Sequence, residues 1–199
     1  MSAKKGLTDK QLDGLKELGN VGTSHAATAL SQVLNQKIMI SIPKIIPFPF
    51  KNLGGGSQAV IAGVMVPVLG DLAAKMVLLL PRHTTIKLAS IMTDKPTTER
   101  QTLTDMEYSA IKELGNILGG AYSNAITEFT GLLLMQSVPE LILDLAEVVL
   151  AEIARDFKTD NKLICIISEF FDLDKSINGY VLFIPDQASL EVILRSLKL

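Results

Sequence analysis

The sequence predicts an α/β fold, in which helices with one apolar face pack against a sheet of buried strands. Three features indicate this class. Two long helical segments begin at recognisable caps, short apolar runs rich in β-branched residues stand between prolines and glycines, and this arrangement occurs twice along the chain. The 199 residues are 48% hydrophobic and 20% charged, so the chain can form a sizeable core in one or two small domains.

The first helix is expected to begin at about residue 9. Thr8 and Gln11 fit a capping box, in which each side chain accepts a hydrogen bond from the other residue's backbone N–H. Apolar or small residues then recur at helical spacing through Leu34, which predicts that one side of the helix is buried. These residues are Leu15, Leu18, Gly22, Ala26, Ala29 and Val33.

A strand is predicted from Gln36 to Ile42, ending at Pro43, because the residues alternate and many are β-branched. Pro47, Pro49 and the run Gly54-Gly55-Gly56 then indicate an irregular connection. The glycine run lacks the spacing and the Lys-Ser/Thr pair of a nucleotide-binding loop, so a plain loop is favoured over a phosphate site.

An antiparallel pair of strands is predicted next, from Gln58 to Val66 and from Lys75 to Leu80, with Gly70-Asp71 as the turn. Thr84 to Met92 is expected to form a short helix. The polar segment from Thr93 to Arg100 contains a proline and would join the two halves of the chain.

The pattern then begins again at an offset of 96 residues (113 − 17). Thr104 and Glu107 repeat the capping box, and Lys112-Glu113-Leu114-Gly115-Asn116 repeats residues 16–20. We therefore predict a single domain built from two tandem repeats, about residues 7–93 and 103–199.

The second half differs from the first in one segment. Apolar residues recur at helical spacing from Glu140 to Phe157, which predicts an extra helix. A strand from Lys162 to Glu169, a closing strand from Tyr180 to Pro185 and a last helix from Asp186 complete the prediction.

Each long helix carries the same polar face. Asp13, Glu17 and Asn20 stand at i, i+4 and i+7, within roughly 60° of arc on one side of a helix. A solvated helix front is the ordinary interpretation, but the recurrence of the pattern in register favours a functional one. The second copy is Ser109, Glu113 and Asn116. Small residues around each Asn are expected to leave room for another backbone: Gly19, Ser24, Gly115 and Gly120.

A Glu and an Asn on an exposed helix suit phosphoryl chemistry on a protein substrate. The pattern contains no nucleophile, histidine base or metal cluster, so acyl transfer and metal-assisted hydrolysis fit poorly. A carboxamide can accept a hydrogen bond from a water and orient it for in-line attack on a phosphoryl group. A carboxylate one turn away could pair with a cation on the substrate.

Composition argues against several other classes. The net charge of −2 and the absence of Lys/Arg-rich runs argue against a nucleic-acid partner. His25, His83 and the single cysteine, Cys165, are too scattered for a metal site, and Cys165 is expected to be a core residue. Mean hydropathy is +0.34, but no apolar run reaches the ~20 residues of a membrane span and no signal-peptide pattern is present. We therefore expect a cytoplasmic protein.

At the polar helix faces the sequence resembles the CheC/CheX/FliY family of chemotaxis phosphatases, most closely its CheC branch. The family motif is Asp or Ser, three residues, Glu, two residues, Asn, 22 residues and Pro, and this chain fits it twice. Pro43 and Pro139 are the closing prolines of the two copies. The resemblance extends over essentially the whole chain.

The resemblance implies a central, largely antiparallel sheet of about six strands from two pseudo-symmetric halves, with the motif helices side by side on one surface. It also implies hydrolysis of the aspartyl phosphate of a CheY-type response regulator. Asn20 and Asn116 would orient the attacking water, while Glu17 and Glu113 would pair with a regulator lysine. The Mg²⁺ would belong to the regulator, so the chain would need no cofactor of its own.

The resemblance further implies a monomer and a second partner, the receptor deamidase CheD, which raises the phosphatase activity of CheC-type proteins. We expect the extra helix, with Asp144 exposed on it, to contact CheD; a plain covering helix is the alternative. Two other functions stay open. One is a non-catalytic adaptor for CheD, and the other is a structural domain like those of flagellar switch proteins.

Overall fold

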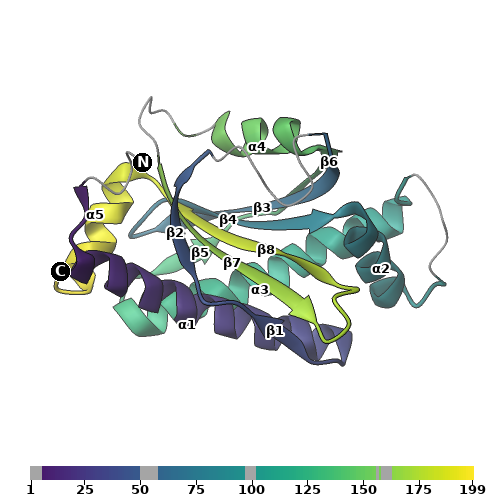
Figure 1. Ribbon diagram of the computed structural model, residues 1–199, viewed down its shortest axis with the longest axis horizontal. Coiled ribbons are helices and arrows are strands. Elements are labelled where there is room, and N and C mark those ends of the chain that lie inside the picture. Colours follow the sequence, from purple (N-terminus) through teal and green to yellow (C-terminus); the bar gives the residue numbers. More distant parts are fainter. Residues whose placement is uncertain (1–5, 50–57, 97–101, 156, 158–162) are drawn as a thin grey trace.

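The computed structural model describes residues 6–49, 58–96, 102–155, 157 and 163–199. Within these residues, an eight-stranded antiparallel sheet forms the centre, and helices cover both of its faces (Figure 1). The predicted α/β class is confirmed. In chain order the elements are α1 (Asp9–Leu34), β1 (Ile38–Ile40), β2 (Lys44–Phe48), β3 (Val60–Gly70), β4 (Ala74–Pro81), α2 (Arg82–Thr93), α3 (Asp105–Thr130), β5 (Leu134–Gln136), β6 (Glu140–Leu145), α4 (Ala146–Arg155), β7 (Leu163–Asp172), β8 (Asn178–Pro185) and α5 (Gln187–Ser196).

Each half of the chain completes the sheet of the other half. The strands follow the order β1-β7-β8-β4-β3-β5, with β2 also paired to β7 and β6 also paired to β3. The halves meet at the central pair, where Leu79 of β4 lies opposite Tyr180 of β8. The first half pairs β1 and β2 with β7, and the second half pairs β5 and β6 with β3. This reciprocal pairing is the pseudo-two-fold arrangement expected, while the exact bounds of the two repeats stay a prediction.

The two motif helices, α1 and α3, lie side by side on one face of the sheet and run in opposite directions (Figure 1). Both predicted capping boxes are present, at Thr8 and Thr104. The helices lie close together at Gly22 of α1, where a Cβ would lie only 2.6 Å from the ring of Tyr122 on α3. A glycine at this position therefore sets the spacing of the two helices.

The extra helix of the second half, α4, covers the opposite face of the sheet (Figure 1). Its residues Val149 and Ile153 are fully buried in a second core cluster together with Phe48 and Cys165. The expectation that Cys165 is a core residue is confirmed. Burial raises the pKa of its thiol well above the ordinary range, so the thiolate is disfavoured there.

Two predicted elements are wrong. Lys44–Phe48 forms β2, where an irregular connection was predicted, because an edge strand pairs on one side only and so tolerates Pro47. Glu140–Leu145 forms β6 and pairs with β3, so the extra helix begins only at Ala146. Leu141 and Leu145 have helical spacing, but the free edge of β3 offers backbone partners that favour a strand. The predicted loop at Gly54–Gly56 lies outside the described residues.

Candidate functional site

The polar face of α1 is exposed as predicted. Asp13, Glu17 and Asn20 are all solvent-exposed on the helix. The side chain of Asp13 accepts a hydrogen bond from the Lys16 ammonium at 2.8 Å. The first motif copy therefore carries an ion pair at its start and a carboxamide open to solvent at its end.

The corresponding face of α3 differs in the exposure and hydrogen bonding of its Asn. Ser109 and Glu113 are exposed, whereas Asn116 is half-buried. The Nε2 of Gln136, on β5, donates a hydrogen bond to the Oδ1 of Asn116 at 2.8 Å. The carboxamide of the second copy is thus held by a neighbouring strand.

Two glycines of α3 make room for the Gln136 amide. A Cβ at Gly119 would lie 2.8 Å from the Oε1 of Gln136, and a Cβ at Gly120 would lie 3.4 Å from its Nε2. At the offset of 96 residues, the first copy has Thr23 and Ser24 in place of these glycines and Ile40 in place of Gln136. Gln136 is not among the site residues predicted from the sequence. The signal available for it was this departure from the repeat.

The glycine before each Asn allows the helix to pack closely against the sheet. A Cβ at Gly19 would lie 2.4 Å from the Cγ2 of Ile166, and one at Gly115 would lie 2.3 Å from the Cγ1 of Val64. The expectation that these two glycines leave room for another backbone is therefore wrong, because their space is filled from within the chain.

The motif prolines lie in the segments that join two strands beside each motif helix. Pro43 and Pro139 are both buried. Pro43 packs beside Gly19, since a Cβ there would lie 3.1 Å from the Cβ of Pro43. The fourth motif position therefore contacts the helix next to Asn20, although it stands 23 residues later in the chain (43 − 20).

In the second copy, all four motif residues line one surface pocket of about 560 Å³. The pocket combines helix residues of α3 with the segment that links β5 to β6. Its lining is Ser109, Lys112, Glu113, Asn116, Gln136, Ser137, Val138 and Pro139. The predicted site residues of the second copy are thus together in space, with a cation, a carboxylate and two carboxamides around one hollow.

Asp144 lies on β6 and not on a helix, which corrects its predicted setting. Its Cα is paired with that of Ile61 on β3, and its side chain is exposed. The backbone N–H of Leu145 donates to its Oδ1 at 2.7 Å. Asp144 therefore stands on the strand that leads into α4.

Neither a metal cluster nor a membrane span is found in the part of the chain that the structure describes. No group of three or more His, Cys, Asp and Glu side chains among these residues could hold a metal ion. No helix among them is long and apolar enough to cross a membrane.

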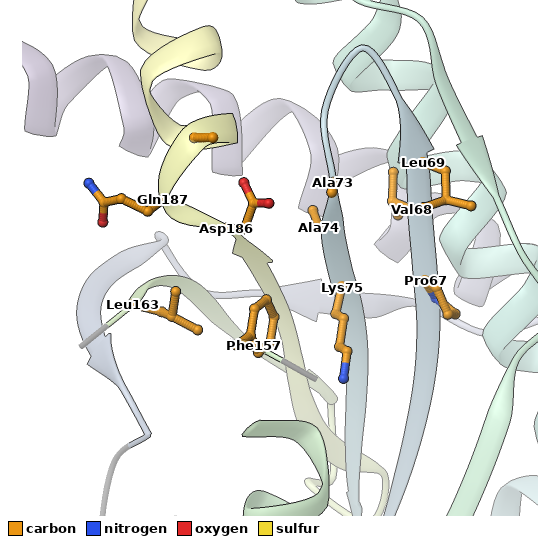
Figure 2. A pocket seen from close by; sticks show the side chains of 11 residues that line it. Pro67, Val68, Leu69, Ala73, Ala74, Lys75, Phe157, Leu163, Asp186 and Gln187 are labelled. Carbon is orange, nitrogen blue, oxygen red and sulfur yellow. The ribbon is translucent and has the colours of Figure 1, made fainter. Parts of the chain in front are cut away.

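A second pocket, of about 550 Å³, lies between the turn of β3 and β4 and the start of α5 (Figure 2). Its walls are largely apolar, and none of the motif residues lines it. The ammonium of Lys75 donates to the carbonyl oxygen of Ile153 at 3.0 Å and lies 5.1 Å from the centroid of the Phe157 ring. Lys75 thus ties β4 to the end of α4, which is a structural role.

A family model and a similar protein sequence point to the same family. A family model described as the CheC-like family matches residues 11–46 and 106–143, which contain the two motif copies. The chain is 31% identical over 199 aligned residues to the CheY-P phosphatase CheC of Bacillus subtilis (strain 168), covering 96% of this chain and 95% of that relative.

Solved structures show the same fold. FliY from Thermotoga maritima matches with a TM-score of 0.74 at 20% identity, over 97% of this chain and 98% of the FliY chain. A chain of the CheX-CheY-BeF3-Mg²⁺ complex from Borrelia burgdorferi matches with a TM-score of 0.58 at 15% identity, over 83% of this chain and 95% of that one.

Proposed function

Since the chain belongs to the CheC-like family, we propose that it hydrolyses the aspartyl phosphate of a CheY-type response regulator. The relative that is similar along nearly its whole length bears the name CheY-P phosphatase. A structural neighbour comes from a complex of CheX with CheY, BeF3 and Mg²⁺. Both relatives support a phosphorylated regulator as the substrate.

The observation that carries the proposal is the placement of the motif, twice, at the surface of the molecule. Glu17 with Asn20, and Glu113 with Asn116, occupy the same positions on two helices that share one face of the molecule. A partner protein can reach groups placed on such a face, whereas a small substrate would need a deeper pocket. Two copies of the motif give the chain two candidate sites.

The proposed reaction requires this chain to position a water molecule and does not require a strongly reactive side chain. Each motif Asn would accept a hydrogen bond from a water and hold it in line with the phosphorus, and that water would displace the aspartate carboxylate. Each motif Glu would pair with a lysine of the regulator and so fix the position of the Asn. The Mg²⁺ that neutralises the phosphoryl oxygens would be the regulator's own.

We also propose the receptor deamidase CheD as a second partner. The candidate contact is α4, with Asp144 on the strand before it, since α4 has no counterpart among the described residues of the first half. A monomer in the cytoplasm would fit both partners. Addition of CheD to the assay below tests this part of the proposal.

The test is the decay of a phosphorylated CheY-type regulator in Mg²⁺, measured alone and with this protein. Acceleration by the wild type that is lost in the variant Asn20→Ala/Asn116→Ala supports the proposal, while circular dichroism checks that the variant is folded. Equal acceleration by both proteins would contradict the assigned residues. No acceleration with or without CheD would instead favour the adaptor or structural function.

A further inference from the structure

The two most exposed large apolar side chains among the described residues are Ile42, at 79% of its full accessible surface, and Val138, at 73%. They occupy equivalent positions in the two motif copies, because their separation of 96 residues (138 − 42) equals that of Asn20 and Asn116 (116 − 20). Single exposed apolar residues are common on protein surfaces. Two that share one position in a repeat, each directly before a motif proline, form a pattern.

Both side chains are held outward by the same local structure. The sequences are Ser41-Ile42-Pro43 and Ser137-Val138-Pro139, and each tripeptide joins two strands. The serine N–H groups donate to carbonyl oxygens of the neighbouring strand, Ser41 to Glu169 and Ser137 to Pro67, both at 2.8 Å.

The proline on the other side of each residue is buried, and a residue before proline is restricted to extended backbone. The fold therefore presents each β-branched side chain in a fixed direction, at small entropic cost to a binding partner.

In the second copy, the exposed valine lies beside the motif residues. Val138 lines the same pocket as Glu113, Asn116 and Pro139. A protein that brings a phosphoryl group to Asn116 therefore comes close to Val138. In the first copy, Ile42 precedes Pro43, which packs against the helix beside Asn20.

We propose that Ile42 and Val138 are apolar anchors that bind the receiver domain of the phosphorylated regulator beside its phosphoaspartate. This inference rests on the proposed function and adds the residues that supply affinity. The motif Glu and Asn are polar groups that must be desolvated on binding, which costs free energy. An aliphatic side chain that passes from nearly full exposure to burial supplies the compensating apolar contact. The anchors would act on the regulator before and during the reaction alike, so they would change KM and not kcat.

The test uses single-site proteins, so that each anchor is measured alone. Ile42→Ser is made in the Asn116→Ala background, and Val138→Ser in the Asn20→Ala background. We expect each to raise the KM for the phosphorylated regulator about tenfold, with kcat changed by less than about twofold. Ile42→Val and Val138→Ile should restore the KM. Leu173→Ser is the matched control, because Leu173 is an apolar side chain of similar exposure, at 69%, that belongs to neither motif copy.

A second measurement separates this inference from the proposed function. Titration of the wild type and the serine variants with a CheY-type regulator carrying BeF3 and Mg²⁺ reports affinity without catalysis, and we expect about tenfold weaker binding for each serine variant. An active wild type whose KM and affinity are insensitive to both substitutions overturns the anchors alone. A fall in kcat at constant KM also overturns them, and a wild type that neither binds nor dephosphorylates the regulator overturns both proposals.

Discussion

The Nε2 of Gln136 donates a hydrogen bond to the Oδ1 of Asn116 at 2.8 Å, whereas the residue at the position of Gln136 in the first copy is Ile40. The side chain of isoleucine has no group that can form a hydrogen bond with an amide. The two candidate sites therefore differ in how their Asn side chains are held, although their motif residues match. Asn116 is held by a hydrogen bond from β5, whereas Asn20 is exposed to solvent.

The first prediction concerns this hydrogen bond. Replacing Gln136 by Ile, the residue of the other copy, should lower kcat of the second site about three- to tenfold, because loss of one orienting hydrogen bond is worth about 1 kcal/mol. The measurement is regulator dephosphorylation in the Asn20→Ala background. Gly119→Ala should act similarly, since its Cβ would lie 2.8 Å from the Oε1 of Gln136.

The control for Gln136→Ile is the same substitution in the Asn116→Ala background, where only the first site works. Activity there should not change. An equal loss in both backgrounds would mean that Gln136 supports the fold and not Asn116 in particular.

The second prediction concerns the contact of α1 with the sheet. Gly19→Ala should destabilise the protein by about 1–2 kcal/mol, because the new methyl would lie 2.4 Å from Ile166 and overpacking outweighs the gain in helix propensity. Gly115→Ala should do the same against Val64. Urea unfolding measures both. A stability equal to that of the wild type would show that the sheet yields to the methyl group without cost.

The parts of the fold that could be predicted are those that depend on neighbouring residues. The caps at Thr8 and Thr104 and the buried sides of α1 and α3 follow from local spacing, and the structure confirms them. β6 could not be predicted in this way, because its conformation depends on the free edge of β3, which lies about 80 residues earlier in the chain (140 − 60).

In the candidate site, too, local features could be predicted and contacts between distant residues could not. The exposed front of each motif helix was predicted from the helical repeat, since the spacing alone places the three side chains on one face. The hydrogen bond between Gln136 and Asn116 could not be predicted, because it joins residues 20 positions apart and depends on where β5 lies beside α3. The packing of Pro43 beside Gly19 likewise gives a structural reason for a position that was known only as part of a motif.

The third prediction concerns the contact between the motif helices. The hydroxyl of Tyr122 is buried and has no hydrogen-bond partner among the described residues, and its ring stacks on Phe183 with a centroid distance of 5.3 Å. Tyr122→Phe should keep the ring packing while removing an unsatisfied polar group, which costs about 1–3 kcal/mol when buried. We therefore expect the free energy of unfolding to rise or stay unchanged. A loss of more than about 1 kcal/mol in urea unfolding would indicate a partner for the hydroxyl.

The fourth prediction concerns the turn between β7 and β8, where Asp172 is buried. Burial alone would raise the pKa of Asp172. Hydrogen bonds from the Ile177 N–H at 3.0 Å and the Ser176 hydroxyl at 2.6 Å, with the charge of Lys87 nearby, outweigh it and lower the pKa below 3.8. Because the folded-state pKa is the lower one, the stabilisation is fully present above about pH 4 and is lost as the pH falls through the folded-state pKa.

Replacement of this carboxylate should therefore matter at neutral pH and not in acid. Asp172→Asn should lower the free energy of unfolding by about 1–3 kcal/mol at pH 7, and the difference from the wild type should shrink as the pH falls below about 4. Urea unfolding between pH 3 and pH 7 measures this. Asp174→Asn, at an exposed position in the same turn, is the control and should follow the wild type throughout. A constant difference between Asp172→Asn and the wild type over this range would mean that the turn depends on the shape of the side chain and not on its charge.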